Sequence, residues 1–97
     1  MHLTDFKFKE NYVSFLLNET YYMVRFSCGN LSFRKNSKEL YSVSIRNEVK
    51  FQFQIMYLDT DRSSFWIKDD LNYVSVYLDR QKIKIIYQDS VFTHYLD

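Results

Sequence analysis

The sequence predicts an all-β protein, an antiparallel meander of about nine to ten short strands forming a small barrel or a two-sheet sandwich. Apolar and polar residues alternate along most of the chain, which is the period of a strand, and no long stretch follows a helical period. Aromatic residues make up 20% of the 97 residues, and they favour strands. With no proline and one glycine, no linker is evident, so we expect a single all-β domain over residues 1–97.

The first half of the chain is predicted to form three successive hairpins that share one apolar face. Two-residue turns at 10–11, 19–20 and 29–30 keep one apolar face in register across four strands, because side chains alternate along a strand. The dipeptide Gly29-Asn30 is the clearest turn signal among these three turns. The expected pairs are Phe8 with Val13, Phe6 with Phe15, Leu17 with Tyr22, Phe15 with Val24, Cys28 with Leu31, and Phe26 with Phe33.

The middle of the chain is less regular. A polar connection at 34–39 precedes two alternating stretches, 41–45 and 49–57, and their faces match only with a three-residue loop at 46–48. Residues 59–71 alternate least, and we expect a loop around a short strand at 65–67.

The last clear hairpin lies within residues 72–88. Val74, Val76 and Leu78 share one face with Ile83, Ile85 and Tyr87 when Arg80 and Gln81 form the turn. The opposite face then carries Tyr73 opposite Gln88, Ser75 opposite Ile86, and Tyr77 opposite Lys84. A further turn at 89–90 would add Val91, Thr93 and Tyr95 to that outer face.

This outer face is apolar for a solvent-exposed sheet. Tyrosine is favoured at protein interfaces because its ring buries area while its hydroxyl finds a partner. The alternative, which the sequence leaves open, is that the 59–71 loop and Trp66 cover the face within the molecule. The residues predicted for protein binding are Tyr73, Tyr77, Ile86, Lys84, Tyr95 and Trp66.

A second outer face carries basic residues. In the expected register Lys7 lies opposite Ser14, Ser14 opposite Arg25, and Arg25 opposite Arg34. Cations interleaved with aromatic rings suit single-stranded nucleic acid or an acidic protein. The residues predicted for this binding are Lys7, Lys9, Tyr12, Arg25 and Arg34. The formal net charge of +1 weighs against nucleic acid, whose binding depends on released counterions.

Groups for catalysis or metal binding are few. His94 is expected among core residues in one register and outside in another, and Cys28 is expected to pack in the apolar face. The carboxylates of 59, 61, 69 and 70 could gather around calcium, but they lack the spacing of a known calcium loop. We therefore expect no catalytic residue, no metal and no cofactor.

The predicted function is that of a small non-catalytic protein-binding module. Its partner is another protein or a copy of itself in a homodimer. The Lys-, Asn-, Tyr- and Phe-rich composition is typical of AT-rich genomes, which suggests a phage or mobile-element inhibitor of a host protein, such as an anti-defence protein. The alternatives are a nucleic-acid-binding β-domain and a barrel for a small apolar ligand.

The expected location is the cytoplasm. The N-terminus lacks the apolar run of a signal peptide, and no stretch is long and apolar enough to cross a bilayer. Cys28 is the single cysteine and cannot form an internal disulfide. We therefore expect no membrane association.

Overall fold

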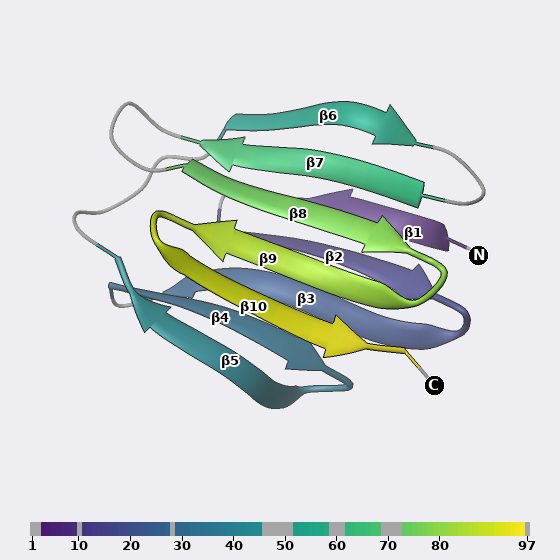
Figure 1. Ribbon diagram of the computed structural model, residues 1–97, viewed down its shortest axis with the longest axis horizontal. Helices are drawn as coiled ribbons and strands as arrows, with labels where there is room; N and C mark the ends of the chain where they lie inside the picture. The colour runs from purple at the N-terminus through teal and green to yellow at the C-terminus, as the bar shows by residue number, and fades with distance from the viewer. Residues whose placement is uncertain are drawn as a thin grey trace. The chain divides into compact units, whose positions relative to one another are not determined.

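The structure, a computed structural model, is built from antiparallel strands in two sheets (Figure 1). It describes residues 3–9, 11–27, 29–45, 52–58, 62–68 and 73–96. No helix occurs among them, and none that could cross a membrane is present in these ranges. The chain divides into two units, each of which contains one sheet. The predicted all-β antiparallel fold is confirmed, and the expected single domain stays a prediction.

The first sheet is a meander in which each strand pairs with the next in the chain, in the order β1-β2-β3-β4-β5. Its strands are β1 (Leu3–Phe8), β2 (Tyr12–Leu17), β3 (Thr20–Ser27), β4 (Asn30–Lys35) and β5 (Lys38–Ser44). The alternation that predicted these strands also predicts their faces. The buried apolar residues of β2, β3 and β4 are Val13, Phe15, Leu17, Tyr22, Val24, Phe26, Leu31 and Phe33. We call the face that carries them the inner face of this sheet.

A row of aromatic rings crosses this inner face. The ring centroids of Phe6 and Phe15 are 5.5 Å apart, those of Phe15 and Tyr22 are 5.8 Å apart, and those of Tyr22 and Phe33 are 5.7 Å apart. Offset aromatic pairs at this separation add about 0.5–1.5 kcal/mol each beyond the area they bury. The aromatic-rich composition thus serves cross-strand packing in this sheet.

The β2–β3 turn lies one residue earlier than the sequence predicted. Asn18 and Glu19 form it, with φ of 50° and 68°, and Leu17 pairs with Thr20 while Phe15 pairs with Tyr22. The expected pairing of Leu17 with Tyr22 is therefore wrong by two residues. Two successive positive φ values define the hairpin turn that matches strand twist, and asparagine tolerates this conformation better than most residues.

Glycine at position 19 should stabilise this turn. Glu19 carries a side chain at a φ of 68°, which costs about 1–2 kcal/mol for a residue with a Cβ atom. We expect Glu19→Gly to raise the free energy of unfolding by about 1 kcal/mol, measured by urea denaturation, because it creates the favoured Asn-Gly turn. Glu19→Gln, which removes the charge and keeps the Cβ atom, is the control. An equal gain in both variants would contradict the explanation.

The β3–β4 turn is shifted in the same way. Gly29 lies in the turn with a φ of 76°, and Ser27 pairs with Asn30, so that Phe26 faces Leu31 instead of Phe33. The expected turn at Gly29 and Asn30 is wrong by one position, although both strands keep their apolar face. Cys28 lies outside the described residues, so its predicted packing stays a prediction.

The β1–β2 hairpin keeps its predicted register only near the turn. Phe8 pairs with Val13 and Lys7 with Ser14, after which the register shifts between Thr4 and Lys7. Asp5 has a φ of 53°, which marks a β-bulge with an extra residue in β1. The ring contact between Phe6 and Phe15 survives the shift.

The second sheet is also a meander, in the order β10-β9-β8-β7-β6. Its strands are β6 (Gln52–Leu58), β7 (Arg62–Lys68), β8 (Tyr73–Asp79), β9 (Lys82–Tyr87) and β10 (Ser90–Tyr95). The segment expected to be a loop with a three-residue strand contains β7, which pairs along its length with β6 and β8. That expectation is wrong, because backbone pairing on both sides holds β7 extended despite its broken alternation. The connection at 46–48 lies outside the described residues.

The strands that the structure describes do not close into a barrel, which was one of the two expected arrangements. Among the described strands, β1 and β5 end the first sheet and β6 and β10 end the second, each with one hydrogen-bonded neighbour. Two open sheets are what the sandwich alternative requires, and the packing between them stays a prediction. The small-ligand alternative, which was expected of a barrel, stays a prediction.

The β8–β9 hairpin has the predicted register. Val76 pairs with Ile85, Leu78 with Ile83 and Tyr77 with Lys84. The backbone N–H groups of Gln81 and Lys82 donate hydrogen bonds to Oδ1 of Asp79 at 2.7 and 2.8 Å. These hydrogen bonds from the Asp79 side chain stabilise a turn whose central residues, Arg80 and Gln81, are not the Asn-Gly pair that usually favours it. The buried residues of this hairpin are Val74, Val76, Leu78, Ile83, Ile85 and Tyr87, which define the inner face of the second sheet.

The β9–β10 turn is again displaced from the expected position. Gln88, with a φ of 51°, starts it, and Tyr87 pairs with Ser90 instead of Phe92. His94 pairs with Ile83, not with Ile85, and is half-buried. This pairing places His94 on the inner side of β10. The sequence had left open whether His94 lies among core residues or outside.

Candidate protein-binding surface

The outer face of β8, β9 and β10 brings together side chains from three adjacent strands. One row runs from Val91 through Ile86 to Ser75, and the next runs from Thr93 through Lys84 to Tyr77. Tyr95 lies beside Lys82 at the end of β10. We call these eight residues the β8–β10 face: Ser75, Tyr77, Lys82, Lys84, Ile86, Val91, Thr93 and Tyr95.

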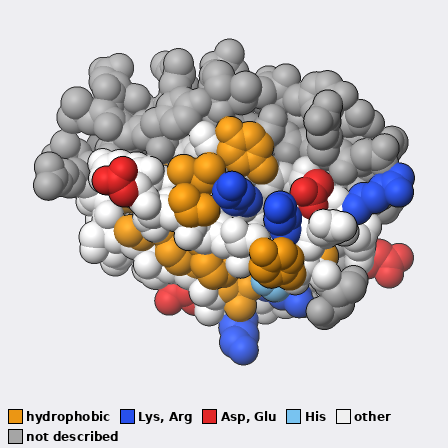
Figure 2. Space-filling view, viewed as in Figure 1, with side chains coloured by type: hydrophobic (Ala, Val, Ile, Leu, Met, Phe, Trp, Pro, Cys, Tyr) orange, Lys and Arg blue, Asp and Glu red, His pale blue; other side chains and the backbone are white. Residues whose placement is uncertain are grey.

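Three large apolar side chains of the β8–β10 face are exposed. Tyr77 is 43% exposed, Val91 is 56% exposed and Tyr95 is 69% exposed, while Ile86 between them is half-buried. Figure 2 shows apolar and basic side chains next to one another on the side of the molecule that these strands present. Among the described residues these three are the large apolar side chains with the greatest exposure. A cluster of this kind marks an interaction site more often than a scattered exposed residue does.

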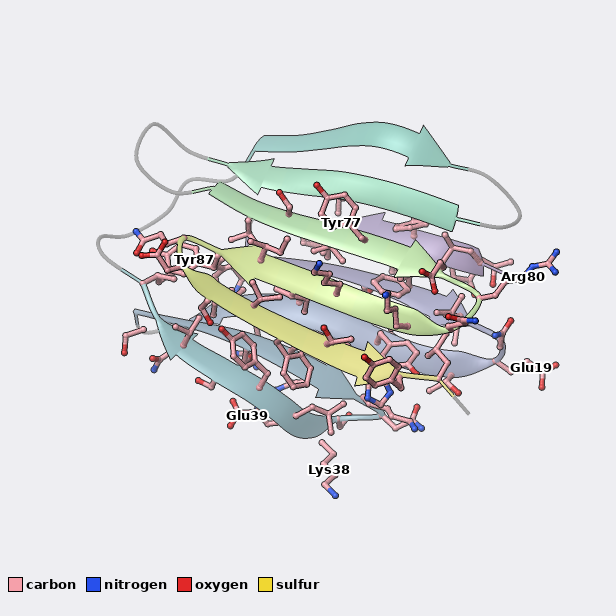
Figure 3. All side chains as sticks on the ribbon, in the orientation of Figure 1. Glu19, Lys38, Glu39, Tyr77, Arg80 and Tyr87 are labelled. Atoms are coloured by element: carbon pink, nitrogen blue, oxygen red, sulfur yellow. The ribbon has the colours of Figure 1, made fainter. Side chains whose placement is uncertain are left out.

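The charge of the β8–β10 face is positive. Lys82 and Lys84 lie between the apolar residues, and both are half-buried. Asp79 has the same parity in β8, but its carboxylate accepts the two backbone hydrogen bonds of the turn. Figure 3 shows Tyr77 on β8 and Arg80 at the adjoining turn, which adds a further cation at that end of the hairpin. The eight residues of the face thus include apolar groups and two cations and no carboxylate, while Asp79 borders the face at the turn.

Four of the six residues predicted for protein binding belong to this face, namely Tyr77, Lys84, Ile86 and Tyr95. Tyr73 begins β8 opposite Lys68, and Trp66 in β7 is the partner of Ser75. Trp66 thus lies in a strand of the same sheet, so the idea that it belongs to a covering loop is wrong. The binding prediction missed Lys82, which the turn at Arg80 and Gln81 already placed beside the outer face.

The basic row predicted on the first sheet is not formed. Ser14 pairs with Met23, Met23 pairs with Arg34, and Arg34 pairs with Glu39, so the row that starts at Lys7 ends at an acid. The two-residue register shifts at both turns cause this change. The carboxylate of Glu39 beside Arg34 makes the row less suitable for phosphate.

Lys9 keeps its predicted neighbour, whereas Arg25 keeps the predicted face but not the predicted neighbours. Arg25 lies between Tyr12 and Ser32. Lys9 donates its backbone N–H to the carbonyl oxygen of Tyr12 at 2.9 Å, as the expected turn requires. Lys7 and Arg25 are exposed, whereas Arg34 is half-buried. These cations share a face without forming a line.

The four aspartates considered for calcium, at positions 59, 61, 69 and 70, lie outside the described residues.

No protein-family model, curated protein or solved structure shows a significant match to this chain. The fold defines the chain as an all-β antiparallel protein with two open sheets.

Proposed function

We propose that this chain is a small non-catalytic protein-binding module that uses the β8–β10 face, and that it inhibits its partner by covering the surface it binds. The observation that supports this proposal is the joint exposure of Tyr77 in β8 and of Val91 and Tyr95 in β10, the two strands that flank β9. Each of these side chains leaves apolar area in water, and a partner that buries it gains roughly 25 cal/mol per Å².

The chemistry of the face indicates an acidic partner surface with apolar groups. Lys82 and Lys84 separate Tyr95 from Tyr77, so a partner that fills the apolar positions brings its own groups within reach of two ammonium groups. Opposite charges there would raise the association rate and select against basic partners. The same arrangement does not favour nucleic acid, because two cations neutralise few phosphates.

A photo-crosslinking experiment in the native cell tests the proposal. A photoreactive residue at Tyr77, which is 43% exposed, should capture one acidic protein, identified by mass spectrometry. The matched control carries the same residue at Ser42, an exposed position of β5 in the other sheet. Capture of the same set of proteins from both positions would contradict a specific surface.

Removal of two apolar side chains should then weaken the captured partner. Truncation of a tyrosine at the centre of an interface costs about 2 kcal/mol or more, so Tyr77→Ala with Ile86→Ser should raise the dissociation constant at least about tenfold. Calorimetric titration measures the binding, and urea denaturation shows that the sheet stays folded. Undiminished binding of a folded double variant would reject the β8–β10 face, whereas loss of cooperative unfolding would show that the two residues belong to the core.

A further inference from the structure

Strand β10 is an edge strand whose backbone can accept another strand. It pairs with β9 on one side and ends the second sheet. The N–H of Leu96 donates to the carbonyl of Gln81 at 2.7 Å, which continues the register of the β9–β10 pair. In an antiparallel pair such bonds alternate, so the N–H and C=O groups of Val91, Thr93 and Tyr95 point away from β9 toward the edge.

The other edges are protected in ways that β10 is not. The registers of β1, β5 and β6 with their neighbours each contain a shift, whereas β10 pairs with β9 through six consecutive residues without one. Bulges and charged residues are the devices by which proteins prevent edge-to-edge association. The sequence of β10, SVFTHY, contains no Lys, Arg, Asp, Glu or Pro. An unprotected edge of this kind is typical of a strand that pairs with another chain.

We infer that β10 pairs antiparallel with β10 of a second copy, about a twofold axis at Thr93, so that the two second sheets join into one. In this register Thr93 lies opposite Thr93 of the other copy, and Val91 lies opposite Tyr95. Both pairs are hydrogen-bonded pairs, because the free N–H and C=O groups of β10 belong to these residues. Thr–Thr and aromatic–β-branched pairs are favourable cross-strand combinations.

Charge does not oppose this pairing. The nearest cation is Lys84, the partner of Thr93 in β9. Lys84 and its copy would be separated by three strand spacings, or about 14 Å, which exceeds the screening length of about 8 Å at physiological salt. The strand is thus complementary to itself in its side chains, in its backbone and in its lack of charge. This inference goes beyond the proposed function, since it concerns the edge of the sheet instead of its outer face.

Sedimentation equilibrium of the purified full chain tests the inference. We expect a dimer that Thr93→Pro converts to a monomer, because proline removes an edge N–H that has no bond to β9. Thr93→Lys, which places like charges opposite each other at the axis, should do the same and serves where proline disturbs the fold. Thr93→Val keeps the backbone groups and should remain dimeric. A monomeric parent chain, or a dimer that both Thr93→Pro and Thr93→Lys leave intact, overturns the inference.

Disulfide formation tests the register. Two cysteine variants, Thr93→Cys and Val91→Cys, are compared. Each also carries Cys28→Ser, which removes the single cysteine of the native chain. Thr93→Cys should form an intermolecular disulfide, because hydrogen-bonded partners have Cα atoms about 5.5 Å apart, within the range of roughly 4.4–6.8 Å that the bond allows. Val91→Cys should crosslink at least about tenfold more slowly, because the two copies of residue 91 would lie roughly 14 Å apart. Equal rates in both variants would contradict the twofold axis at Thr93.

The two proposals can fail separately. Tyr77→Ala leaves the β10 edge intact and should not change the sedimentation of the dimer. If Thr93→Cys crosslinks while no specific partner is captured at the β8–β10 face, the proposed function fails alone. If a partner is captured by a chain that sediments as a monomer, the edge pairing fails alone.

Discussion

Phe15→Ala should lower the free energy of unfolding by about 3–5 kcal/mol, the usual range for removing a buried phenylalanine from a core. Phe15 is fully buried, and its ring lies 5.5 Å from that of Phe6 and 5.8 Å from that of Tyr22. The substitution removes buried area and interrupts the aromatic row in its middle. Because small domains have a stability of about 5–15 kcal/mol, the loss should be visible as a large decrease in the urea midpoint.

The control is Tyr12→Ala, which removes an aromatic ring from the opposite face of the same strand. Tyr12 is half-buried, so its loss should cost about 1 kcal/mol, the centre of the distribution for single substitutions. A cycle with Tyr22→Leu should show a coupling of about 0.5–1.5 kcal/mol between the neighbouring rings. Equal costs at Phe15 and Tyr12 would show that the aromatic row does not distinguish the inner face.

The faces of the strands could be predicted from sequence alone, because they depend on a period of two. The buried apolar residues of β2 to β4, β8 and β9 are the ones that alternation assigned to a common face. The exposed Tyr77 was likewise assigned to the outer face, and Val91 and Tyr95 were assigned to it on the condition of a further turn after β9. Alternation is a strong signal here because large aromatic and β-branched side chains occupy nearly every inner position.

The register could be predicted only to within two residues. A shift of two leaves every side chain on its face, so alternation cannot separate a turn at Asn18 and Glu19 from one at Glu19 and Thr20. The choice depends on which residues adopt positive φ, and here it falls on Asn18, Glu19 and Gln88. The β8–β9 turn was predicted correctly because Asp79 lies where its side chain closes the turn.

These shifts affected the two candidate sites differently. The basic row needed specific neighbours across three hairpins, and two shifted turns placed Met23 between Ser14 and Arg34. The β8–β10 face needed only a shared side and one correct hairpin, so its apolar residues remained together when the β9–β10 turn moved. Neither the bulge at Asp5 nor the full length of β7 leaves a signal in the alternation, because both arise from backbone pairing.

Ile85 and Ile86 provide the sharpest test of which face of the second sheet is core and which is exposed, since they are neighbouring isoleucines on opposite faces of β9. Ile85 is fully buried, and Ile86 is half-buried on the β8–β10 face. Ile85→Asp places an ionised carboxylate in the core without a partner, which costs more than about 4 kcal/mol. We therefore expect this variant to lose its cooperative urea transition at neutral pH.

Ile86→Asp should keep a cooperative transition and lose only about 1 kcal/mol, because its carboxylate reaches water. It places a negative charge two residues from Lys84 and opposite the exposed Val91, where the proposed acidic partner would approach. Binding of that partner should fall at least about tenfold while the far-UV circular dichroism spectrum stays that of a β protein. If Ile86→Asp unfolds the chain as completely as Ile85→Asp does, the outer face is a second core, and both its exposure and its role in binding are wrong.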